Sequence, residues 1–91
     1  MIDTVKLLHE IWEDFDGDGS SLPSCCLAGP DGDSCRKMLS PKAHMVHVFE
    51  ASSHHEAMTV YNKFLGREPY QTDQSSDFEP YPSEWAARQR R

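Results

Sequence analysis

The sequence lacks a long hydrophobic run, and no stretch approaches the roughly 18 apolar residues that a membrane-spanning helix needs. Its N-terminal segment, MIDTVKLLHEIWED, is acidic and has no basic region of the kind that opens a signal peptide, so we expect no such peptide and a cytoplasmic location. Cysteine is scarce, with three residues in the chain. In a cytoplasmic protein we expect these cysteines to be reduced thiols.

Basic residues are also in short supply, because 9 Lys and Arg face 15 Asp and Glu, which gives a net charge of −6. This balance argues against a general nucleic-acid binder and against a protein that binds anionic membranes, since both need basic surface. Gly-rich phosphate loops, nucleophile elbows and Walker patterns are absent as well. The sequence therefore predicts no cofactor, and an enzyme is the less favoured class.

One strand-to-helix unit organises the chain. Residues 44–50 alternate apolar β-formers and predict a strand that lies inside a sheet. Ser53 and Glu56 have the spacing of a capping box, which predicts a helix over 53–65. Gly66 stands where a left-handed residue ends a helix, and Pro69 prevents its continuation. A strand that leads directly into a helix excludes an all-β fold.

Residues 3–15 carry an apolar stripe at helical spacing and predict a second main helix. Residues 22–28 predict a strand, the likeliest partner of 44–50, and residues 35–39 predict a short helix. We therefore expect residues 1–91 to form one small α+β domain, in which a two- or three-stranded sheet packs against helices 3–15 and 53–65.

The C-terminal region, residues 67–91, predicts an irregular tail that wraps the body, with a frayed end. We expect an edge strand at 68–72 and a last helical turn at 84–89; the sequence leaves the order of 73–79 open. Four aromatic residues would anchor the tail: Tyr70, Phe78, Tyr81 and Trp85. The predicted core consists of Val5, Leu8, Ile11, Trp12, Val46, Val48, Phe49, Ala57, Val60, Tyr61, Phe64 and Leu65.

A half-match to a calcium-binding loop covers residues 14–19. Asp14, Asp16 and Asp18 alternate as the first carboxylate ligands of an EF-hand do, and a glycine follows them. Cys25 stands where the closing Glu belongs, and Pro23 stands where the exiting helix should begin. The pattern indicates a weak calcium site or a plain acidic turn.

Histidine and cysteine gather between residues 25 and 55, which suggests zinc. No C-x-x-C or H-x₃-H spacing is present, so only the tertiary fold could assemble a site, for example from His47, His54 and Cys35. Whether Cys25, Cys26 or Cys35 approaches a histidine cannot be read from the sequence. Cys35 close to a helix N-terminus is also the candidate nucleophile of a small thiol- or histidine-dependent enzyme.

The run FEASSHHEAM, followed by Leu65-Gly66, the late PYP motif at 80–82 and Trp85, resembles small bacterial proteins of unknown function. These proteins share an F-E-A-x-S-x-x-E-A-M strand-to-helix core and a C-terminal P-Y-P-x-x-W. The likeness covers about the C-terminal half of the chain. It implies a bacterial cytoplasmic origin and a single domain, and it brings no activity with it.

These patterns leave three functional hypotheses. The leading one is a small acidic, soluble interaction or regulatory protein without catalysis, because a short sheet leaves an edge that can pair with a partner protein or form a homodimer. The alternative is a metal-binding module that uses either the aspartate loop or the His/Cys set. The third is the small enzyme.

Overall fold

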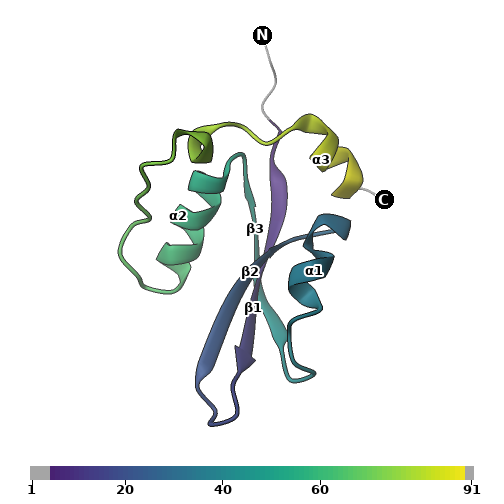
Figure 1. Ribbon diagram of the computed structural model, residues 1–91, viewed down its shortest axis with the longest axis vertical. Coiled ribbons are helices and arrows are strands. Elements are labelled where there is room, and N and C mark those ends of the chain that lie inside the picture. Colours follow the sequence, from purple (N-terminus) through teal and green to yellow (C-terminus); the bar gives the residue numbers. More distant parts are fainter. Residues whose placement is uncertain (1–4, 90–91) are drawn as a thin grey trace.

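The computed structural model describes residues 5–89 and shows an α+β fold, as the sequence predicts (Figure 1). Within these residues, three antiparallel strands form one sheet in the order β2-β1-β3. Helix α2 lies on one side of this sheet and helix α1 on the other, while α3 lies near the end of β1 at which the chain enters the sheet (Figure 1). The principal extents are 50 × 33 × 19 Å.

The predicted helix over 3–15 is wrong. Residues Leu7–Phe15 form β1, the central strand, while residues 3–4 of that prediction lie outside the described part. The burial pattern alternates, with Leu7, His9 and Ile11 buried on one face. His9 hides this alternation in the sequence, because histidine is classed as a polar residue and interrupts the apolar pattern. Pairing with a strand on either side outweighs the helical tendency of this leucine- and glutamate-rich segment.

Strands β2 (Ser21–Leu27) and β3 (His44–Ala51) form where the sequence predicts them. Their predicted pairing with each other is wrong, because each pairs with β1 and both are edge strands. The tight turn at 16–20 joins β1 to β2 as a hairpin. In β3 the register shifts between the partners of Ile11 and Trp12, so Val46 is an extra residue and forms a β-bulge.

Helix α2 (His54–Phe64) confirms the predicted helix and its cap. The Ser53 hydroxyl accepts a hydrogen bond from the Glu56 amide at 3.1 Å. The Glu56 carboxylate accepts from the Ser52 amide at 2.8 Å, one residue earlier than the capping box predicts. Gly66 has φ +72°, the left-handed conformation expected after the helix.

Only part of the predicted core is buried. Ile11 and Ala57 are buried as expected, and Leu7, Cys26, Ala51 and Ala86 join them. Four predicted core residues are exposed instead: Leu8, Val46, Val48 and Phe64. Leu8 points away from α2 because it belongs to a strand, and β3 is exposed because it is an edge strand with little covering its α1 side.

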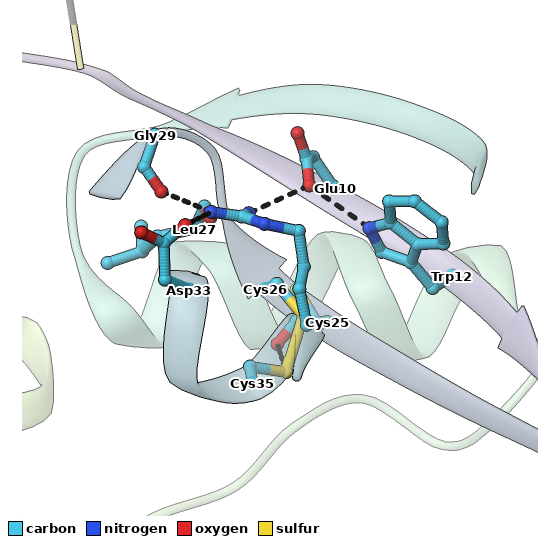
Figure 2. The surroundings of a disulfide bond; sticks show 9 residues. Glu10, Trp12, Cys25, Cys26, Leu27, Gly29, Asp33 and Cys35 are labelled. Carbon is cyan, nitrogen blue, oxygen red and sulfur yellow. Dashed lines mark hydrogen bonds and ion pairs between the residues drawn. A yellow bond between two sulfur atoms is a disulfide. The ribbon is translucent and has the colours of Figure 1, made fainter. Parts of the chain in front are cut away.

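A 3-10 turn, η1 (Pro30–Gly32), leads into α1 (Asp33–Arg36), which starts earlier and is shorter than the predicted helix over 35–39. A disulfide joins Cys26 on β2 to Cys35 on α1, with 6.0 Å between their Cα atoms (Figure 2). The prediction that all three cysteines are reduced is therefore wrong, and Cys25 alone is a free thiol. The bridge holds α1 against the sheet and joins two cysteines nine positions apart in the sequence.

An ionic cluster next to the disulfide fixes the same helix. The Arg36 guanidinium donates to the Glu10 carboxylate at 3.0 Å, to the Leu27 carbonyl at 2.7 Å and to Asp33 at 2.7 Å. The Trp12 indole donates to the same Glu10 oxygen at 3.0 Å, so this carboxylate lies between two donors (Figure 2). The pKa of Arg36 lies above its usual range, and the hydrogen bond to Asp33 is the largest cause of this rise.

The C-terminal segment contains η2 (Ser75–Phe78) and α3 (Ser83–Gln89), and residues 68–72 form no strand, contrary to prediction. The Gln89 side-chain amide bonds to the Leu8 amide and carbonyl and to the Ala28 carbonyl, at 2.9–3.0 Å. Arg88 donates to both carboxylate oxygens of Asp31 at 3.0 Å. These contacts attach α3 to the sheet and to η1; the predicted fraying of residues 90–91 lies outside the described part.

Candidate functional site

The three aspartates of the predicted calcium loop do not converge. Asp14 is buried, and its carboxylate accepts from the Ser40 hydroxyl and amide, contacts that lower its pKa, together with a hydrogen bond from the Phe15 amide. Asp16 and Asp18 accept hydrogen bonds from backbone amides inside the hairpin turn, at 2.9–3.0 Å. These carboxylates therefore stabilise the turn and the loop before β3.

The predicted zinc ligands also lie apart. The Cys35 sulfur is bonded to Cys26, which removes it as a thiolate ligand and as a nucleophile. His47 stacks on Phe64 with 4.9 Å between ring centroids, and His54 meets Tyr70 edge to face at 5.9 Å. Within residues 5–89, no group of three His, Cys, Asp or Glu side chains has an arrangement that could hold a metal ion.

A polar contact that the sequence does not predict joins the central strand to the C-terminal segment. The His9 Nδ1 lies 2.9 Å from the Leu7 carbonyl, which can only accept, so this nitrogen carries the proton. Nε2 then accepts from the Tyr81 hydroxyl at 3.0 Å, and the ring stacks on Phe49. Burial raises the pKa of Tyr81 to about 12, which keeps that hydroxyl protonated.

His9 makes stability depend on pH. Burial lowers its pKa below 6.5; the nearby His54 also lowers it, while the Leu7 carbonyl and Glu56 oppose the shift. A lowered pKa means that the folded state prefers neutral His9. The contribution of neutral His9 to the free energy of unfolding is therefore complete above pH 6.5, and it is lost as the pH falls from 6.5 through the folded-state pKa. The loss from this one group is at most about 1.4 kcal/mol for each pH unit in that window.

We expect the His9 ring signal in a proton NMR titration to have a midpoint below 6.5, the ordinary pKa of a histidine side chain. The unfolding midpoint in urea should also fall between pH 7 and pH 5, and less steeply in the His9→Phe variant, which lacks the titrating group. A His9 midpoint at or above 6.5 would contradict the burial argument.

Two surface pockets flank α2. One, of about 250 Å³, is lined by His54, Glu79, Tyr81 and Trp85 among others. Residues from both the FEASSHHEAM run and the PYP-x-x-W motif therefore meet at this pocket. The strand bridge between Ser53 and Pro80 fixes this junction, as does the hydrogen bond from the Tyr81 amide to the Ser52 carbonyl at 2.9 Å. The Tyr81 hydroxyl is already bonded to His9. The other pocket, of about 340 Å³, lies at the C-terminal end of α2, by Lys63 and Arg67.

The surface with the clearest capacity for binding is the β3 edge. Residues 44–48 are all exposed, although they include Met45, Val46 and Val48. The partners of β3 in the register place Val48, like Met45, on the side of the sheet that carries α1. His47 and Phe49 lie on the side of α2. Among the described residues, strand β3 thus has an unpaired edge, with apolar side chains on its α1 face and aromatic rings on its α2 face.

The two edges of the sheet differ in their protection. Strand β2 carries Pro23 near its centre, a residue that removes a donor from the edge. Strand β3 contains no proline and no lysine, and the bulge at Val46 is its one irregularity. From His47 to Ala51 the strand is regular. Apart from the bulge and the charged Glu50, this apolar edge carries no proline or lysine to oppose pairing, and such an edge is typical of a surface that pairs with another strand.

No protein-family model, curated protein or solved structure matches this chain. In the part of the chain that the structure describes, none of the helices combines the length and apolar character needed to cross a membrane.

The sequence pattern anticipated an available sheet edge in general terms. It placed 22–28 next to 44–50 and so did not reveal which edge of β3 is free.

Proposed function

We propose that this protein is a protein-interaction module that binds an extended segment of a partner along the free edge of β3. The observation that carries the proposal is the exposure of every residue from His44 to Val48 in a strand rich in apolar side chains. Adding a strand to such an edge satisfies the unpaired backbone groups, and the side chains on both faces supply specificity.

The remaining chemistry supports binding more than catalysis. The carboxylates of Glu10, Asp14 and Glu56 already accept hydrogen bonds from the fold. His9 and Tyr81 are bonded to each other, and the Cys35 sulfur lies in a disulfide. An interaction role needs only the surface that β3 provides.

A phage-displayed library of random dodecapeptides tests the β3 edge without knowledge of the natural partner. We expect selected peptides to bind the wild-type chain and to bind the Val48→Lys variant at least tenfold more weakly. Lysine on an edge strand opposes pairing, because its charge cannot be desolvated beside an incoming strand. Titration of labelled synthetic copies of the selected peptides measures the effect.

The matched control is Met38→Lys, which places the same charge at an apolar residue that is 87% exposed and lies outside the sheet. Peptide affinity should stay within twofold of wild type in this variant. Circular dichroism would verify that both variants fold. Peptides that bind all three proteins equally would show that β3 is not the binding edge.

The bacterial cytoplasmic origin inferred from the sequence stays a prediction. The Cys26–Cys35 disulfide argues against the cytoplasmic part of that prediction, because such bonds are uncommon in reducing cytosol and common in oxidising compartments. The metal-binding alternative has less support than the β3 edge, since the described residues bring no three of its ligand types together.

A further inference from the structure

We propose that the partner strand at the β3 edge is β3 of a second copy, paired antiparallel about Val48, so that two sheets join into one of six strands. This inference rests on the proposed function of the edge. A two-fold axis beside Val48 places each Val48 opposite its own copy. The joined sheet then runs β2-β1-β3-β3-β1-β2.

This register keeps side chains of the same face together. Across the axis, Val46 lies opposite Glu50 and His47 lies opposite Phe49. Residues 46, 48 and 50 belong to the α1 side and residues 47 and 49 to the α2 side, so every pair matches in face. The Met45–Val46 bulge falls at the limit of the matched stretch, where it ends the pairing.

Aromatic packing favours the same register. Within one copy, the rings of His9, Phe49, His47 and Phe64 already follow one another, with centroid distances of 5.0, 6.4 and 4.9 Å. Phe64 is nevertheless 45% exposed. Placing a second Phe49 opposite His47 continues this row of rings across the axis, and cross-strand aromatic pairs of this kind stabilise a sheet.

Charge selects the antiparallel arrangement. The protein carries −6 overall, which opposes self-association through most of its surface. Residues 44–49 contain no Asp, Glu, Lys or Arg, and Glu50 is the one charged residue of β3. In the antiparallel register the two Glu50 residues lie four steps apart, about 13 Å, beyond the screening length of about 8 Å. In-register parallel pairing would place them about 5 Å apart.

Cysteine cross-linking tests the register directly. In a Cys25→Ser background, which removes the free thiol, Val48→Cys places two thiols on opposite residues, about 5 Å apart between Cβ atoms, within reach of a disulfide. Met45→Cys is the control, because residue 45 is similarly exposed but its copy lies about 20 Å away. Mild oxidation followed by non-reducing electrophoresis should give at least tenfold more covalent dimer for Val48→Cys.

Light scattering of the wild-type chain between 10 and 500 µM completes the test, and we expect its mass to rise from 10.4 kDa toward twice that value. Equal cross-linking by both cysteine variants would overturn the register. A monomer at every concentration, without Val48→Cys dimer, would overturn self-pairing. In that case, selected peptides that depend on Val48 would leave the proposed function standing, and their absence would end both proposals.

Discussion

Replacing Leu7 by alanine is expected to lower the free energy of unfolding by about 2–5 kcal/mol. The Leu7 side chain is fully buried, with 0% of its surface exposed, and it lies where β1 pairs with Ala51 at the end of β3. Truncation removes buried methyl groups and leaves a cavity that the sheet cannot close. In a domain of this size the loss lowers the melting temperature by ten degrees or more. Urea unfolding followed by circular dichroism measures it.

Leu8→Ala is the matched control, because it makes the same change at the next residue of β1. The Leu8 side chain is 42% exposed. We expect a loss of less than about 1 kcal/mol, since the backbone contacts of Leu8 with Gln89 do not involve its side chain. Comparing the two variants also distinguishes a strand from a helix over this segment, because the predicted helix over 3–15 placed Leu8, and not Leu7, in the core. A larger loss for Leu8→Ala than for Leu7→Ala would contradict the position of β1.

Gly32→Ala is expected to cost about 1–3 kcal/mol or more, because an added methyl group has no room. Gly32 is buried, and a Cβ there would collide with the Leu27 carbonyl oxygen and lie 2.8 Å from its carbon. Its φ of −97° suits any residue, so the cost comes from this collision and not from backbone strain. Relieving the collision moves α1 away from β2 and weakens the hydrogen bond from Arg36 to the Leu27 carbonyl.

Gly17→Ala is the control for this prediction. A Cβ at Gly17 meets nothing within 4 Å, and its φ is not positive, so the free energy of unfolding should change by no more than about 0.5 kcal/mol. Thermal unfolding of both variants under non-reducing conditions keeps the Cys26–Cys35 bridge constant. Equal midpoints for the two variants would show that η1 does not pack on β2 as described.

Elements whose signals are local could be predicted from the sequence. The cap at Ser53, the apolar face of α2 and the left-handed Gly66 all depend on residues within a few positions of one another. The two edge strands were also predicted where they occur, since β-branched residues in β3 and the flanking turns mark them. In these segments the local preference and the fold agree.

The central strand could not be predicted in the same way. The segment LLHEIWEDF fits a helical period as well as an alternating one, and the choice depends on partners 6 to 44 residues away in the sequence. Burial of His9 is equally non-local, because it requires Tyr81 from the C-terminal segment and Phe49 from β3. No local pattern in the sequence therefore indicates that His9 is buried.

The candidate site shows the same division. The sequence determined by itself that β3 is an apolar strand without charge before Glu50, that the chain is acidic, and that a capped helix follows, since these depend on composition and short-range spacing. Only the tertiary structure decided that Leu7–Phe15 lies between β2 and β3, that Cys35 is bonded to Cys26, and that none of residues 5–89 pairs with the outer edge of β3. Strand order and the meeting of distant side chains depend on backbone pairing between remote segments, and no local pattern specifies that pairing.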